Sequence, residues 1–419
     1  MTPELKGMLL LTVLKLLVVF TATVVGVALL TLMERKVSAW MQYRLGPNRV
    51  GFGGLLQPAA DGVKNILKEE TFPGQANRVL FTLAPMMAFI PAMTLGSVIQ
   101  WAAPLPVKFD FTVPVLGQFR YDGLMAMSVI DIPIGILFVL AISSTGVYGI
   151  ALAGWSSNNK YSLLGGLRAS AQMISYEVAM GLSVIPVILL TGSVSFSGII
   201  RAQQEQGWFI FPLFLGFFIF LVSGFAETNR LPFDMPEAES ELIAGYHTEY
   251  SAMKFSMFFI AEYANMVTVS AMVTTLFLGG WGIPFVSVDP AHPGLLGSLH
   301  PGTLATVLTG CVMFLKVFFW LFFFMWIRWT LPRFRYDQLM ALGWKVLMPI
   351  GLAYIMLIAL AIYLVDNVFG VTTPVVKMLV LFVINIVLGY LVFRVFDRGL
   401  LITGSRGGNA AAGGLERTA

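Results

Sequence analysis

The sequence predicts an all-α membrane protein, a bundle of about nine transmembrane helices with an interfacial amphipathic helix. Three observations predict this class. The mean hydropathy is +0.82, and only 11% of the 419 residues are charged, against roughly 25% in soluble proteins. Apolar windows of about 18 or more residues recur along the chain, each long enough to cross about 30 Å of hydrocarbon as a helix. The soluble fold classes are therefore set aside.

Nine apolar windows mark the predicted spans, at 9–33, 79–103, 123–150, 169–190, 209–226, 249–279, 303–327, 346–365 and 378–393. The first is too long for the apolar region of a signal peptide and has no small-residue cleavage site after it. The fifth and ninth are the shortest. The ninth needs Lys377 and Arg394 as snorkelling flanks, so eight spans remain the alternative.

The expected organisation follows from these spans. Residues 1–403 form a single transmembrane domain with inner loops at 34–78, 151–168, 227–248 and 328–345, and residues 404–419 form a disordered tail rich in Gly and Ala. Of the 26 Lys and Arg residues, 18 follow odd-numbered spans, five lie on the opposite side and three lie within spans. By the positive-inside rule, we expect a multi-pass protein of the inner (plasma) membrane, with its N-terminus outside and its C-terminus cytoplasmic.

The loop after the first span opens with ERKVSAWMQYRLGPNRVGFGG. Its basic and aromatic residues suit a surface that docks against another protein, and a loop that binds lipid headgroups is the alternative. From Leu55 onward, Leu55, Ala59, Val63, Ile66 and Leu67 fall on one helical stripe. This spacing predicts the interfacial helix, which either frames an opening from the lipid phase or simply anchors the loop.

Ligands for a redox centre are scarce. The single cysteine, Cys311, allows no internal disulfide and no thiolate-ligated cluster, and three scattered histidines form no obvious haem or metal site. The sequence therefore predicts no metal on this chain, so any redox cofactor must belong to another chain. No run of Lys and Arg resembles a nucleic-acid-binding arm.

Two carboxylates fall inside predicted spans. Asp131 lies about nine residues into the third span and Glu177 lies in the fourth. An ionised carboxylate at mid-membrane costs at least roughly 2.5 to 3.5 kcal/mol, so it needs a partner, a water-filled cavity or a proton. Both are candidates for function, and the alternative is an acid hydrogen-bonded between helices for structural reasons.

Acidic residues are dense between positions 227 and 262. Seven of the chain's 22 acids fall in these 36 residues: Glu227, Asp234, Glu237, Glu239, Glu241, Glu249 and Glu262. Carboxylates this close favour sharing protons, which is the behaviour of a proton relay. A helix that starts at Pro236 and stops near Gly245 explains part of the cluster by ordinary capping.

Three stretches carry a resemblance to a known family. AETNRLPFDMPEAESELIAGYHTEYSAMKFSMFFIAEY (226–263), ERKVSAWMQYRLGPNRVG (34–51) and RWTLPRFRYDQLMALGWKVLMP (328–349) resemble the signatures of the H-subunit family of respiratory complex I. The similarity covers roughly residues 9–365, so the ninth span and the tail lie outside the pattern of the shorter relatives, which end after eight spans.

The resemblance implies a membrane subunit of a proton-translocating NADH:quinone oxidoreductase, an enzyme of the translocase type. It implies quinone as substrate, with FMN and iron-sulphur clusters on partner subunits. The expected partners are the hydrophilic quinone-reducing subunits and the neighbouring small and antiporter-like membrane subunits.

The resemblance also implies roles for residues. It places Glu34, Arg35, Lys36, Arg44, Arg49 and Arg230 at the quinone chamber and its entrance. It assigns Glu227, Asp234, Glu237, Glu239 and Glu241 to a loop that responds to quinone reduction. It assigns Asp131, Glu177, Glu249 and Glu262 to a buried carboxylate path toward the antiporter-like subunits.

Three other interpretations stay open. Related membrane-bound hydrogenases and ferredoxin-driven complexes have similar membrane subunits. A stand-alone ion transporter also needs buried acids, although the sequence lacks the internal repeat common in such transporters. A purely structural anchor for the enzyme is the third interpretation.

Overall fold

A computed structural model describes residues 2–114, 117–236, 242–283, 286, 300, 302–370 and 373–397. Within these ranges the chain is a helical bundle, so the predicted fold class is confirmed. The predicted tail at 404–419 lies outside the described residues, and so do Glu237, Glu239 and Glu241.

Eight described helices are long and apolar enough to cross a membrane. They are α1 (Pro3–Met41), α3 (Arg78–Leu95), α4 (Gly135–Ser156), α5 (Lys160–Thr191), α9 (Ala252–Phe277), α10 (Thr303–Thr330), the continuous helix Tyr336–Val368 that contains α11 (Tyr336–Ala341) and α12 (Met348–Tyr363), and α13 (Pro374–Asp397). The fifth predicted span is the shorter helix α7, Phe214–Glu227. Its 14 residues reach only about 21 Å, less than the roughly 30 Å of a hydrocarbon core.

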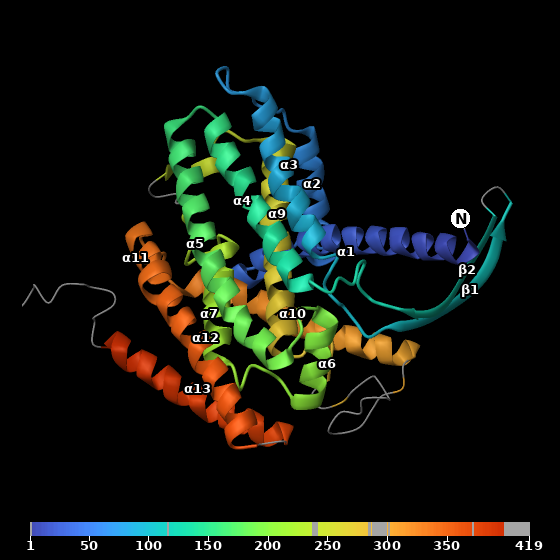
Figure 1. Ribbon diagram of the computed structural model, residues 1–419. Coiled ribbons are helices and arrows are strands. Elements are labelled where there is room, and N and C mark those ends of the chain that lie inside the picture. The colour runs from blue at the N-terminus through green and yellow to red at the C-terminus, as the bar shows by residue number, and fades with distance from the viewer. Residues whose placement is uncertain are drawn as a thin grey trace, which may run out of the picture.

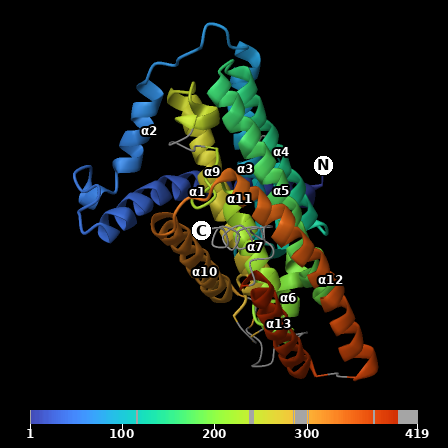
Figure 2. The ribbon, with the colours of Figure 1, turned by 90° about the vertical axis from the view of Figure 1, so that its left-hand side faces the viewer.

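Helices α3, α4, α5 and α9 pack together at the centre of the bundle, and α12 and α13 lie to one side of them (Figure 1). Helices α3 and α4 approach closely at Gly149, where an added Cβ would lie 2.6 Å from the backbone nitrogen of Ala88. Small residues at such a crossing let two backbones come into direct contact, as is common in membrane bundles. Figure 2 shows α10, α7 and α13 from the side.

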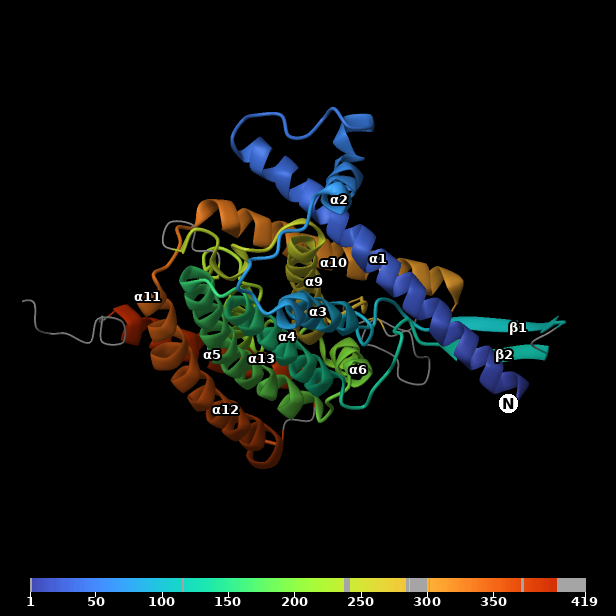
Figure 3. The same ribbon diagram turned by 90° about the horizontal axis from the view of Figure 1, so that it is seen from above.

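A β-hairpin was not predicted. Strands β1 (Leu105–Val113) and β2 (Gly117–Met125) pair antiparallel, with Phe109 opposite Tyr121 and Phe111 opposite Phe119. These four rings share one face because side chains alternate along a strand. The hairpin lies along the N-terminal half of α1, which runs away from the other helices (Figure 3).

The hairpin shows that the predicted start of the third span, 123–150, is wrong. Residues 123–125 belong to β2, and the helix begins only at Gly135. Pro133 disfavours helical backbone at the residue before it and lacks an N–H group, which helps to explain the late start. The prediction that Asp131 lies within a transmembrane helix is therefore wrong, because Asp131 is exposed in the segment between β2 and α4.

Other helix ends also differ from the predictions. Helix α1 continues to Met41, α5 begins at Lys160 and α11 begins at Tyr336, so the inner loops 34–78, 151–168 and 328–345 are partly helical. Helix α9 begins at Ala252, so the prediction that a helix carries Glu249 into the membrane is wrong.

Two short helices remain. Helix α2 (Gln57–Leu67) is the predicted interfacial helix, and helix α6 (Phe196–Gln206) was not predicted. The apolar residues Val63, Ile66 and Leu67 of α2 are exposed to the surroundings of the chain. An amphipathic helix with its apolar side uncovered suits the membrane surface. Half of the helix expected from Pro236 to Gly245 falls on positions 237–241, outside the described residues.

Candidate functional site

Glu34 is the centre of a buried ionic cluster. It lies near the C-terminal end of α1 and is 6% exposed. The Tyr263 hydroxyl of α9 donates a hydrogen bond to Glu34 Oε2 at 2.6 Å, and Arg328 of α10 forms an ion pair with Glu34 Oε1. Because the partners come from α9 and α10, one carboxylate joins three helices.

Arg230 stands between two carboxylates. Its Nε lies 2.6 Å from Glu262 Oε1, and its Nη1 lies 3.5 Å from Glu34 Oε2. Its guanidinium carbon is 4.2 Å from the centre of the Tyr263 ring, a cation–π contact. Burial alone would lower the pKa of Arg230, but Glu262, Tyr263 and Glu34 outweigh burial and raise it, so the arginine stays charged. Two arginines and two carboxylates therefore balance their charges inside the protein.

The segment after α7 is held in place from α5. Gln172 Nε2 donates hydrogen bonds to the backbone oxygens of Ala226 at 2.8 Å and Phe233 at 2.7 Å. Asp234 is buried and pairs with Arg333 at 2.8 Å. These contacts fix both sides of Arg230, so its position does not depend on its own ion pairs alone.

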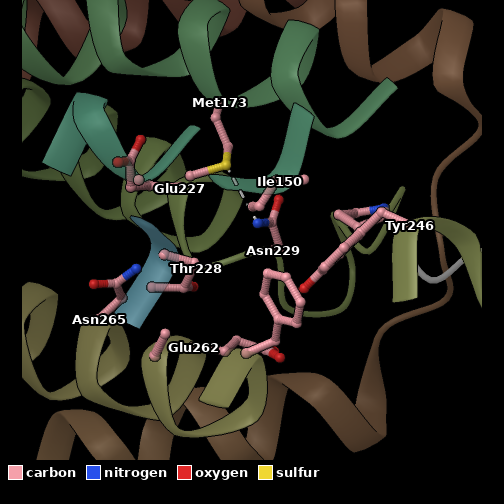
Figure 4. A pocket seen from close by; sticks show the side chains of 13 residues that line it. Ile150, Met173, Glu227, Thr228, Asn229, Tyr246, Glu262 and Asn265 are labelled. Carbon is pink, nitrogen blue, oxygen red and sulfur yellow. Dashed lines mark hydrogen bonds between the residues drawn. The ribbon is translucent and has the colours of Figure 1, made fainter. Parts of the chain in front are cut away.

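A small cavity lies beside the cluster, with a volume of about 30 Å³. Glu227 at the end of α7 and Glu262 of α9 both line it, together with Thr228, Asn229 and Asn265 (Figure 4). A polar site holds a water once it offers about 10–15 Å³, so this volume suits about two waters. Among the described residues, Glu227 Oε2 and Asn265 Oδ1 have no hydrogen-bond partner, and both can accept from such waters.

Glu177 extends the polar line toward α4. Its side chain lies near Ser144 of α4, and its charge interacts with that of Glu227. The acids of α5, α7 and α9 thus follow one another as Glu177, Glu227 and Glu262, and Arg230 connects the last of them to Glu34. This arrangement can pass a change in protonation through short electrostatic steps.

Other predicted site residues lie apart from the cluster. Asp131 is exposed beyond the start of α4, and Glu249 accepts a hydrogen bond from Asn159 at 2.7 Å in the segment before α9. Arg35 pairs with Asp61 of α2 at 2.6 Å, which ties the interfacial helix to α1. Three further predicted cations are exposed or half-exposed on the first inner segment: Lys36, Arg44 and Arg49.

Sequence reasoning missed Tyr263 and Arg328. Tyr263 directly follows Glu262, and Arg328 is the first residue of the third family-like stretch. A tyrosine next to an intramembrane acid and an arginine at the end of a span were the available signals. Neither identifies Glu34 as the shared partner, which lies 229 residues before Tyr263 and 294 before Arg328.

Fold and site together define a class of protein: a multi-span helical membrane protein whose interior carries ionisable side chains around a small polar cavity. The family model described as NADH dehydrogenase matches residues 14–359. The chain belongs to this NADH dehydrogenase family.

Individual relatives agree with the family match. The chain is 51% identical to NADH-quinone oxidoreductase H subunit 2 of Koribacter versatilis, over 85% of this chain and 98% of the relative. It is 49% identical to NADH-quinone oxidoreductase subunit 8 of Rhodothermus marinus, over 83% of this chain and 95% of the relative. It is 48% identical to NADH-quinone oxidoreductase H subunit 2 of Geobacter metallireducens, over 84% of this chain and 95% of the relative.

Proposed function

We propose that this chain is the H-type membrane component of an NADH-quinone oxidoreductase and couples quinone reduction to proton translocation. The observation that carries the proposal is the shared cavity of Glu227 and Glu262 together with the ion pairs by which Arg230 joins Glu262 to Glu34. Glu177 is near enough to Glu227 for their charges to interact. These groups join the C-terminal end of α1 to the interior of the bundle. The proposed reaction, reduction of quinone by NADH, comes from the names of the relatives.

The quinone chamber is proposed to lie against the Glu34 end of this series of groups. Reduction of a quinone to a quinol consumes two electrons and two protons, and each side chain of the chamber that donates one of these protons is left one charge more negative. In a low-dielectric interior such a change acts strongly on neighbouring ion pairs. Arg230 can then shift its pairing between Glu34 and Glu262, and Glu262 and Glu227 can exchange protons through the cavity between them.

The surrounding residues have supporting roles in this proposal. Arg35, Lys36, Arg44 and Arg49 border the chamber and its entrance, and α2 frames the path by which a lipid-soluble quinone enters from the bilayer. Asp234, Glu237, Glu239, Glu241 and Glu249 belong to the acidic loop that responds to reduction. Asp131 has no part in the path, because it lies in an exposed segment outside the helices.

The enzyme needs partner chains. FMN and iron-sulphur clusters are proposed on hydrophilic partner subunits that dock on the inner loops, and small and antiporter-like membrane subunits are proposed as lateral neighbours. The excess of Lys and Arg on the odd-numbered loops supports a plasma-membrane protein with its N-terminus outside and its C-terminus cytoplasmic.

The test compares Glu227→Gln with Asp131→Asn in the assembled complex in sealed membrane vesicles. We expect Glu227→Gln to abolish most NADH-driven proton pumping, because a buried relay acid becomes unable to ionise, and Asp131→Asn to pump as the unaltered enzyme does. NADH oxidation by a water-soluble acceptor that bypasses quinone controls for assembly. Normal pumping by an assembled Glu227→Gln enzyme would overturn the proposal.

A further inference from the structure

An apolar groove lies between α13 and the segment that joins α6 to α7. Its volume is about 450 Å³, and its walls include Trp208 and Phe211 on one side and Val375, Leu379 and Phe382 of α13 on the other. Phe211 and Phe382 meet edge to face across it at 6.2 Å. The groove depends on α13, which lies beyond the residues that the family model matches.

Helix α13 is anchored at this position. Asn385 is fully buried, accepts a hydrogen bond from the Tyr354 hydroxyl of α12 at 2.8 Å and donates one to the backbone oxygen of Pro212. These contacts lie about one turn beyond Phe382 and hold α13 against Pro212, which also lines the groove. The groove is therefore held between two anchored segments and has apolar walls.

One of the residues that line the groove has a polar atom without a partner. Gln206 lines the groove at the last residue of α6, and its Oε1 is buried without a hydrogen-bond partner among the described residues. An unsatisfied buried acceptor costs about 1–3 kcal/mol, so a donor supplied by a ligand would be favoured there. Gln206 ends α6, and α6 lies at the end of the bundle where α13 begins and α5 ends (Figures 1 and 2).

We propose that the groove binds one acyl chain of a phospholipid whose head group donates a hydrogen bond to Gln206. The walls match an aliphatic chain, and the orphaned acceptor lies where α13 begins at one face of the bundle. An ammonium or hydroxyl donor is required, which suits phosphatidylethanolamine or phosphatidylglycerol. The isoprenoid tail of a quinone carries no such donor.

The groove opens to the surroundings of the chain. Its wall residues Phe211, Val375 and Leu379 are exposed. A single acyl chain can therefore enter from the bilayer that surrounds α13.

The first test is photo-crosslinking of the whole complex in nanodiscs of phosphatidylethanolamine and phosphatidylcholine, with a trace of phosphatidylethanolamine that carries a diazirine in its acyl chain. We expect label on peptides that contain 206–212 and 375–382. Leu379→Trp fills the groove and lowers this label about tenfold, whereas Val383→Trp, an exposed position on α13, leaves it unchanged. Even labelling of all lipid-facing helices, or label that Leu379→Trp does not reduce, would overturn the site.

The second test concerns the head group and other occupants. Phosphatidylcholine has no N–H or O–H donor in its head group, so the unaltered protein should favour phosphatidylethanolamine by about two- to tenfold, the range of one net hydrogen bond, and Gln206→Leu should remove the preference. Equal binding of both lipids would refute the role of Gln206. A quinone with a diazirine in its tail should not label these peptides, and strong labelling that competes with the lipid would make the quinone the occupant and overturn the proposal.

Discussion

Arg230 is the residue through which the buried ion pairs are connected. It is 3% exposed and lies within 3.5 Å of two carboxylates from two helices. A buried ion pair stabilises a protein only when the geometry compensates for desolvation, but removal of one partner leaves an uncompensated charge. The cluster is therefore sensitive to loss of the arginine.

We predict that Arg230→Gln destabilises the assembled complex by about 3–5 kcal/mol and lowers NADH:quinone turnover, because Glu34 and Glu262 lose their shared cation. Arg230→Lys should have an intermediate effect, because an ammonium keeps the charge but not the planar stacking on Tyr263. Thermal unfolding and turnover are the measurements. Arg201→Gln on the exposed surface of α6 is the matched control, and equal effects of the two Gln variants would contradict the prediction.

At the scale of elements, two kinds of contact set the positions of the helices that carry the buried acids. One is close packing at a glycine, and the other is a set of hydrogen bonds made by a buried asparagine. Gly149 lets α4 lie directly on α3. Asn385 ties α13 to α12 and to the backbone just before α7, the short helix that ends at Glu227. Backbone groups in hydrocarbon need partners, and Asn385 supplies one where α7 is too short to span.

We predict that Gly149→Ala destabilises the protein by about 1–3 kcal/mol, because the new methyl group overlaps the backbone of α3. Gly181→Ala on α5 is the control, since an added Cβ there meets nothing within 4 Å. The midpoint of thermal unfolding of each variant measures the difference. Equal midpoints would show that α3 and α4 can separate without cost.

We also predict that Asn385→Leu destabilises the complex by about 1–3 kcal/mol, because the Tyr354 hydroxyl and the Pro212 carbonyl lose a buried partner. Tyr354→Phe should cost less than Asn385→Leu, since it removes only one of the two contacts. The midpoints of thermal unfolding of the two variants measure the loss. The control is Ile386→Leu, at an exposed position on the same helix. No loss in Asn385→Leu would mean that α13 packs without this anchor.

At the scale of the whole molecule, the apolar windows predicted the helical membrane class and the positions of the eight long helices and of α7, because hydrophobicity decides what can cross a bilayer. They misplaced Asp131, since the window at 123–150 also covered the end of β2 and the non-helical segment before Gly135. The alternation in VKFDFTV and QFRYD was the missed signal of period two. The convergence of Glu34, Arg230 and Arg328 needed the fold, because their contacts span up to 294 residues.

The intact complex offers the most direct test of proton transfer at the buried acids. Redox-triggered infrared difference spectroscopy follows the C=O stretch of protonated carboxyl groups as quinone is reduced in the membrane. We predict carboxyl bands that appear or disappear on reduction and that are lost from the spectra of Glu227→Gln and Glu262→Gln but persist in Asp131→Asn. Unchanged carboxyl bands in both Gln variants would contradict the proposal that these acids exchange protons when quinone is reduced.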